Sequence, residues 1–189
     1  MILMKDIIDD TNPLLREKSE LVDLPLKQED RDLLMSMYEY LKNSQNEEMI
    51  EKYELRAGVG IAAVQLGILK RMFALLIYDY DEENNIIGVN TSYALVNPKI
   101  ISHSIKKVYL KDGEGCLSVN ENYDGYVPRY NKVTVQGYDA ITNQSVTIVA
   151  RGYLSIVLQH ELDHFDGKLF YDYIDPNDPY KPIEDAIEL

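Results

Sequence analysis

The chain has 189 residues and a mass of 21.8 kDa, a size that fits one compact domain. Hydrophobic residues make up 46% of it and charged residues 27%, which is ordinary globular usage and excludes a disordered, collagen-like or membrane-spanning chain. A formal net charge of -13 repels phosphate backbones and anionic lipids, so we expect neither direct nucleic-acid binding nor a membrane partner.

Helical patterns dominate the first part of the chain. Pro13 follows Asn12, so either Thr11 or Asn12 is placed to cap a short helix over 14–21. Apolar side chains over 28–41 recur at spacings of three and four, which predicts an amphipathic helix. The polar stretch that follows either extends this helix or forms a surface insertion, and the sequence leaves both open.

Strand patterns dominate the middle. Five segments carry them: 72–80, 92–102, 106–110, 132–140 and 145–150. A turn or exposed loop is predicted at 81–85, and Pro98 marks a kink or a sheet edge. The last two segments are separated by ITNQ, which is typical of a hairpin.

A second helical pattern lies near the end of the chain. It covers 153–165 and ends before Gly167, a suitable residue for a helix C-terminus. The predicted fold is therefore α+β, with N-terminal helices and mostly antiparallel strands flanking this later helix, and we expect residues 1–189 to form a single domain.

The most specific local signal lies on that later helix. His160, Glu161 and His164 form an HExxH pattern, and positions four apart on a helix share a face, so both imidazoles can bind one ion. The adjacent glutamate of such sites stays off the metal and handles the proton of a metal-bound water. Two histidines and a glutamate on an exposed helix face are the simpler alternative.

A catalytic metal site of this kind needs a third protein ligand and one open position. The metzincin pattern fails because Phe170 stands where its third histidine would be. Glu184 lies downstream, as in thermolysin-like enzymes, but in a short, charged terminus. Cys116 is the better donor, because two imidazoles and one thiolate make a soft and nearly neutralising set for a divalent ion.

Three motifs together resemble a known family. The sequences GVGIAAVQ at 58–65, EGCLS at 114–118 and QHELDH at 159–164 are similar, in this order, to the three signature motifs of peptide deformylases. The resemblance covers most of the chain. It implies a metallohydrolase that removes the N-formyl group from the N-terminal formyl-methionine of nascent bacterial polypeptides and releases formate.

The resemblance also implies roles for individual residues. Cys116, His160 and His164 would hold one divalent ion, typically Fe2+ in the cell, with Ni2+, Co2+ or Zn2+ able to replace it. Glu161 would take the proton of the metal-bound water and later pass it to the leaving amine. The Gln65 side chain and the Leu117 N–H would stabilise the anion that forms on the formyl oxygen.

The substrate site is implied in the same way. The residues assigned to it are Val59, Gly60, Gly115, Tyr153, Ile156 and Val157. The peptide would lie along the Val59–Gly60 backbone as an added strand, and the apolar side chains would form the methionine pocket. Tyr153 is bulky for this pocket.

Supporting residues surround these positions. In the family, Glu114 supports the site without binding the ion, and Arg129 is a natural partner for it. Asp163 is expected to orient an imidazole or to face solvent, with a slight preference for the first. His103 is expected to be structural or exposed.

Two inserted segments, 81–93 and 120–129, resemble loops of the longer deformylases of Gram-positive bacteria. The chain ends in the acidic IEDAIEL, whereas relatives that dock on the ribosome carry a basic helical tail. Any ribosome contact is therefore expected to be transient. The acidic residues in the opening MILMKDIIDD and the lone Cys116 both favour a cytoplasmic protein.

Two other functions compete with this interpretation. A general HExxH peptidase would cleave internal bonds of unformylated peptides, but its third-ligand signatures are absent from the sequence. A deformylase-like protein that binds metal without turnover would be expected to lack Glu161 or a ligand, and all of these residues are present.

Overall fold

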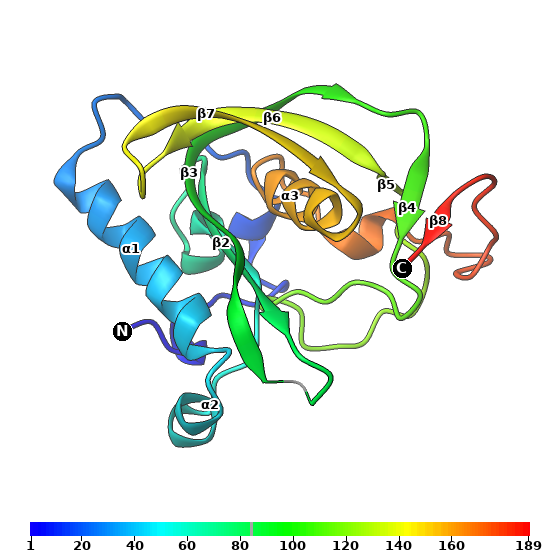
Figure 1. Ribbon diagram of the computed structural model, residues 1–189, viewed down its shortest axis with the longest axis horizontal. Helices are drawn as coiled ribbons and strands as arrows, with labels where there is room; N and C mark the ends of the chain where they lie inside the picture. Colours follow the sequence, from blue (N-terminus) through cyan, green and yellow to red (C-terminus); the bar gives the residue numbers. More distant parts are fainter. Residues whose placement is uncertain (84) are drawn as a thin grey trace.

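The computed structural model describes residues 1–83 and 85–189 and has the expected α+β fold (Figure 1). Within these residues the main sheet is antiparallel, with strand order β1-β2-β3-β6-β7, and a smaller sheet has the order β5-β4-β8. The strands of the main sheet are β1 (Gly60–Ala62), β2 (Met72–Tyr80), β3 (Ile86–His103), β6 (Lys132–Asp139) and β7 (Gln144–Arg151). Those of the smaller sheet are β4 (Lys107–Tyr109), β5 (Arg129–Tyr130) and β8 (Ile187–Glu188).

Three α-helices and several short 3-10 turns accompany the sheets in the described residues. The α-helices are α1 (Gln28–Asn43), α2 (Glu47–Tyr53) and α3 (Gly152–His164). The 3-10 turns are η1 (Met4–Asp6), η2 (Pro13–Arg16), η3 (Ala63–Leu66) and η4 (Phe170–Tyr173). The helices predicted over 28–41 and 153–165 are thus confirmed.

Strand β2 separates the two main hydrophobic clusters. Its side chains alternate between faces, so Met72, Ala74 and Leu76 pack in the cluster that contains α1. Phe73 and Leu75 pack in the cluster that contains α3. Burial on both faces explains why the first part of this strand, residues 72–77, is an unbroken apolar run. Figure 1 shows the curved sheet wrapping over α3, with α1 at its other side.

Helix α3 is fixed to the smaller sheet by polar side chains. Gln159 Oε1 accepts from the Tyr130 N–H at 2.9 Å, and Gln159 Nε2 donates to the Tyr130 carbonyl at 2.9 Å. Ser155 Oγ donates to the same carbonyl at 2.7 Å. These bonds set the rotation of α3, and therefore the direction in which its histidines point.

The chain turns after α3 at Gly167, as predicted. Gly167 has a φ of 68°, and a Cβ there would collide with the Arg16 carbonyl. Both facts favour glycine at this position. The turn brings the segment after α3 against η2.

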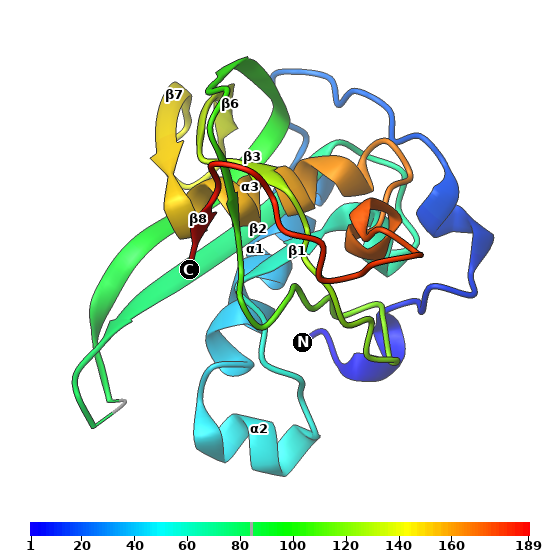
Figure 2. The ribbon, with the colours of Figure 1, turned by 90° about the vertical axis from the view of Figure 1, so that its right-hand side faces the viewer.

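The predicted hairpin of β6 and β7 is confirmed, and so is the kink at Pro98, where the β3–β6 register shifts between Val96 and Lys99. The expected loop over 81–93 is wrong for much of its length, because β3 begins at Ile86 and pairs with β2. The result is a long hairpin arm that projects from the body (Figure 2). Asn84, part of the turn predicted at 81–85, lies outside the described residues.

One early segment differs from expectation, and a second, which the sequence left open, is defined by the structure. The helix predicted over 14–21 is only the turn η2, which Asn12 caps by accepting from the Leu14 N–H at 3.1 Å. The following residues bond to distant backbone instead, since Ser19 N donates to the Phe165 carbonyl at 2.9 Å. The polar stretch after α1 forms a separate helix, α2, capped by Asn46.

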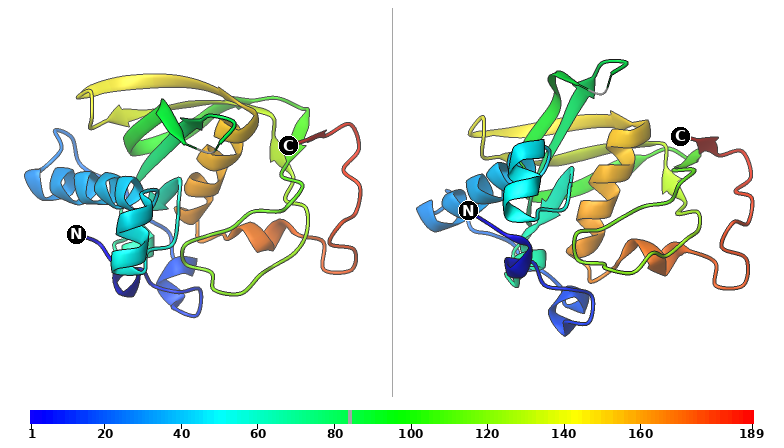
Figure 3. Two further views of the ribbon diagram at one scale, coloured as in Figure 1. Left: turned by 60° about the horizontal axis from the view of Figure 1, so that its bottom comes forward. Right: turned by 90° about the horizontal axis from the view of Figure 1, so that it is seen from below.

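The end of the chain returns to the smaller sheet, where β8 pairs in parallel with β4. Figure 3 shows this segment passing along one side of α3, with the N-terminal residues at the opposite side of the molecule. None of the helices in the described residues has the length and apolar character needed to span a bilayer.

Candidate active site

The three ligand atoms of Cys116, His160 and His164 lie within 4.8 Å of one another. Cys116 Sγ is 3.5 Å from His164 Nε2. Two donors bound to one tetrahedral ion, at about 2.3 Å for sulfur and 2.1 Å for nitrogen, are about 3.6 Å apart, so the spacing fits a shared ion. Glu184, the other candidate ligand, is exposed and lies outside this group.

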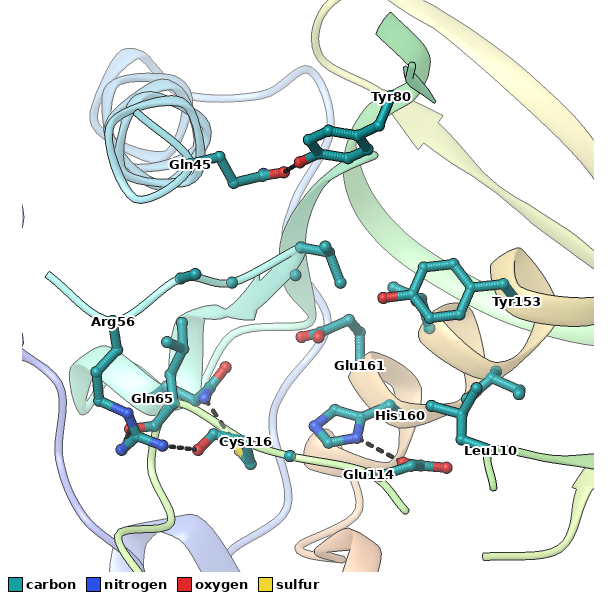
Figure 4. Close-up of a pocket in the computed structure, with 18 residues that line it drawn as sticks. Gln45, Arg56, Gln65, Tyr80, Leu110, Glu114, Cys116, Tyr153, His160 and Glu161 are labelled. Carbon is teal, nitrogen blue, oxygen red and sulfur yellow. Dashed lines mark hydrogen bonds and ion pairs between the residues drawn. The ribbon is translucent and has the colours of Figure 1, made fainter. Parts of the chain in front are cut away.

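The tautomer of His160 is set by Glu114. His160 Nδ1 donates to Glu114 Oε2 at 2.8 Å, which leaves Nε2 for the cluster (Figure 4). Burial alone would raise the pKa of Glu114, but hydrogen bonds from Arg129 and His160 outweigh it and lower the pKa to about 2. Glu114 is therefore an anion throughout the physiological range.

Arg129 joins two carboxylates beneath the cluster. Its Nε and Nη2 donate to Glu114 at 2.7 and 2.9 Å, and its Nη1 donates to Asp163. Asp163 also accepts from the Tyr173 hydroxyl at 2.9 Å. The expectation that Asp163 orients an imidazole is thus wrong, since Glu114 has that contact and Asp163 binds Arg129.

The two imidazoles have different electrostatic environments. Burial lowers the pKa of His164 well below its usual value, which keeps the ring neutral and able to act as a ligand. Burial would lower the pKa of His160 too, but Cys116 and Glu114 outweigh this and raise it. The three donors suit a divalent ion: Cys116 offers a buried thiol, His164 a neutral imidazole, and His160 an imidazole that is hydrogen-bonded to the Glu114 carboxylate.

Gln65 lies beside the sulfur because two contacts fix its amide. Gln65 Oε1 accepts from the Ala62 N–H at 2.8 Å, and Nε2 donates to Ser118 Oγ at 3.2 Å and lies 3.5 Å from Cys116 Sγ. The short turn η3, which is capped by Gly67 with a φ of 75°, places this side chain just after β1.

Arg56 holds the loop that carries the thiol. Its guanidinium donates to the carbonyls of Cys116 at 3.1 Å, Leu117 at 3.2 Å and Val119 at 3.0 Å. The 111–128 segment contains no helix or strand, so these bonds take the place of a sheet ladder. Sequence reasoning missed Arg56, although its position just before the glycine motif was a signal.

Glu161 is buried beside the cluster, and its Oε2 has no hydrogen-bond partner in the described part of the chain. Burial raises the pKa of Glu161 to about 7 and outweighs the opposing effect of the His160 charge. A carboxylate that exchanges its proton near neutral pH is suited to general acid-base work. A Cβ at Gly60 would collide with this carboxylate, which explains the glycine.

A cavity of about 370 Å³ opens above these groups. Every residue predicted for the catalytic, metal and substrate sites lines it except His164, which is buried. The lining members are Val59, Gly60, Gln65, Gly115, Cys116, Leu117, Tyr153, Ile156, Val157, His160 and Glu161. The sequence did not single out five other lining residues: Gln45, Arg56, Ala57, Tyr80 and Leu110. His103 lies elsewhere, exposed and stacked on Tyr130 at 3.7 Å between ring centroids.

Comparison with known proteins gives one consistent result. The family model described as polypeptide deformylase matches residues 4–180. A peptide deformylase of Staphylococcus epidermidis is 49% identical over 189 residues, covering 100% of both chains. Peptide deformylase 2 of Bacillus subtilis is 48% identical, covering 100% of this chain and 99% of the relative. The crystal structure of peptide deformylase from Ehrlichia chaffeensis has a TM-score of 0.73 and 32% identity, covering 95% of this chain and 91% of that one.

Proposed function

Since the chain belongs to the polypeptide deformylase family, we propose that its cavity binds the formyl-methionyl end of a nascent polypeptide and that residues 1–189 form one catalytic domain. The protein is a metal-dependent hydrolase that removes the N-formyl group from nascent polypeptides. The observation that carries the mechanism is the meeting of Cys116, His160 and His164 beside Glu161.

Cys116, His160 and His164 would hold the ion. Membership of the family supports Fe2+ as the ion in the cell, and Ni2+, Co2+ or Zn2+ suit the same thiolate and imidazole donors. When bound, the ion supplies a Lewis acid that polarises the formyl oxygen and lowers the pKa of water. Glu114 and Arg129 keep the His160 ring in place during this chemistry.

Glu161 moves the proton. With a pKa of about 7, its carboxylate accepts a proton from the attacking water and passes it to the departing amine. Gln65 Nε2 and the Leu117 N–H donate to the formyl oxygen as negative charge develops on it, and one such donor contributes about 3 kcal/mol. The fixed amide of Gln65, held by Ala62, supports this role because it needs no reorganisation.

The peptide lies along β1. This strand is the first in the order of the main sheet, and its residue Gly60 lines the cavity, so its outer edge is available to an extended substrate. Val59, Tyr153, Ile156 and Val157 surround the methionine side chain, and Gly115 lines the opposite side of the peptide. The substrate forms at ribosomes, so we place the enzyme in the cytoplasm, with transient ribosome contact.

The test is formate release from formyl-Met-Ala-Ser by protein purified without oxygen and analysed for its metals. Unformylated Met-Ala-Ser and its acetylated form serve as controls. We expect one formate per formylated peptide and intact controls. Cleavage of internal bonds in the unformylated peptide, without formate, would instead identify a general peptidase.

A further inference from the structure

Two side chains close the cavity at the end far from the thiol. Tyr80, near the tip of the β2–β3 arm, donates its hydroxyl to Gln45 Oε1 at 3.3 Å. Both residues line the cavity, and Figure 4 shows them across it from Cys116. The family motifs include neither residue, so the reaction itself leaves them without a role.

Gln45 is rigidly held. It follows α1, and its Nε2 donates to the carbonyls of Leu41 and Leu76, each at 3.2 Å. One bond fixes it to the helix and the other to β2. Tyr80 is therefore anchored by an acceptor that is itself fixed, although the tyrosine is 49% exposed.

The strand register gives the distance of Tyr80 from the reaction centre. Gly60, which contacts Glu161, pairs with Leu75 of β2, and the pairing continues with Leu76 N donating to the Val59 carbonyl at 2.8 Å. Tyr80 follows Leu75 by five positions on the same strand, which is about 16 Å at 3.3 Å per residue.

An extended peptide on β1 has nearly the same rise per residue. With its formyl group beside Glu161, its third residue lies about 10 Å away and its fourth about 13 Å away. Because β1 and β2 are antiparallel, a peptide that pairs antiparallel to β1 runs the same way as β2, toward Tyr80. A tyrosine that starts about 16 Å from the centre and lines the cavity then meets these two residues, and not the methionine.

The chemistry around Tyr80 is apolar and aromatic. Ile86 is its cross-strand partner and is 45% exposed, and directly opposed residues share a face of the sheet. Tyr153 lines the same cavity from α3. Burial raises the pKa of Tyr153, and Tyr80 adds to this shift, as expected for two hydroxyls that are electrostatically close.

We propose that Tyr80, anchored by Gln45, is a specificity-determining residue that packs against the third and fourth residues of the formylated peptide and favours apolar or aromatic side chains there. This inference rests on the proposed function. The proposal assigns a substrate preference to the β2–β3 arm, most of which the sequence predicted to be an inserted loop over 81–93.

The test compares three substrates: formyl-Met-Ala amide, formyl-Met-Ala-Phe-Phe amide and formyl-Met-Ala-Gly-Gly amide. We expect the wild-type enzyme to prefer the Phe peptide over the Gly peptide by about threefold to tenfold in kcat/KM, mainly through KM. Tyr80→Ala should abolish this preference. Tyr80→Phe, which keeps the ring and loses the bond to Gln45, should retain part of it.

Ile87→Ala is the matched control, because Ile87 is an exposed apolar residue of the same arm that does not line the cavity. We expect it to keep the wild-type preference. An unchanged preference in Tyr80→Ala, or an equal loss on the dipeptide and the Phe peptide, would overturn the proposal. Absence of formate from all three substrates with the wild-type enzyme would overturn the proposed function instead.

Discussion

Glu114 accepts the Nδ1 proton of His160 at 2.8 Å and is itself clamped by Arg129, which lies 2.7 Å away. The carboxylate therefore couples a proposed metal ligand to a buried cation. Because this pairing fixes which ring nitrogen faces the thiol, it ties the affinity for the ion to a residue that does not touch the ion.

Glu114→Gln should lower metal affinity about 10-fold to 100-fold, because the amide is a weaker acceptor for His160 and leaves Arg129 with less counter-charge. Competition with a chelator, read by elemental analysis, measures the change. The matched control is Glu121→Gln, an exposed glutamate of the same 111–128 segment, which should keep wild-type affinity. Equal affinity in the two variants would exclude this role for Glu114.

Glu161→Ala should retain the metal and lose nearly all turnover, by about 100-fold to 10,000-fold, since it removes proton transfer and leaves the three ligands intact. Formate release and metal content are measured on the same preparation. A metal-free variant whose activity returns on adding metal would show that Glu161 supports binding, and the proton would need another acceptor.

Cys116→Ala should weaken metal binding strongly, because it removes the sulfur that lies 3.5 Å from His164 Nε2. The wild-type iron form should also lose activity in peroxide, since a thiolate and Fe2+ are both oxidisable. Activity is followed over time in preparations shown to contain iron. Full activity after peroxide treatment of such a preparation would contradict the expected ligand set.

Gly60→Ala should reduce kcat sharply while the protein stays folded, because the new methyl group must displace the Glu161 carboxylate. Gly88→Ala is the control, since a Cβ at Gly88 meets no atom within 4 Å. Steady-state kinetics and a thermal melt separate the two effects. If Gly60→Ala instead unfolds, the substitution strains β1, and the effect cannot be assigned to displacement of the Glu161 carboxylate.

Stability should fall at alkaline pH through Tyr40. Burial raises the pKa of Tyr40 from 10 to about 12, partly opposed by Arg56, and its hydroxyl donates to the Arg56 carbonyl at 2.9 Å. A raised pKa means that the stabilisation is complete below pH 10 and is lost as the pH rises toward 12. We expect the free energy of unfolding to drop by about 1–2 kcal/mol over this interval. Urea melts of wild type and Tyr40→Phe at both pH values measure this loss of stability. The variant should lose less free energy of unfolding, because phenylalanine has no hydroxyl to ionise.

Local patterns were enough to predict the elements that bury a regular face. The apolar spacing of α1, the unbroken apolar run of β2 and the alternation of β6 and β7 each reflect burial that a short window of sequence reveals. The HExxH pattern on α3 and the lone thiol likewise indicated the metal cluster, because few other residues offer such donors.

Elements that depend on distant partners could not be predicted in this way. The 14–21 segment has helical composition, but the backbone of Ser19 bonds to Phe165 and that of Glu20 to Leu69. Strand β3 extends back to Ile86 because β2 offers it a partner, and β8 exists because β4 does. Tyr80 and Gln45 meet only through these tertiary contacts, and no spacing in the sequence joins them.

The three carbonyls gathered by the guanidinium of Arg56 have one more consequence. The hydrogen bonds from Arg56 hold the segment that carries Cys116 without a bound ion. Zinc fingers differ, because their chain folds only when the metal binds. Stripping and reloading should therefore be a reversible exchange on an intact scaffold. We therefore expect different divalent cations to exchange at the site of a single folded molecule.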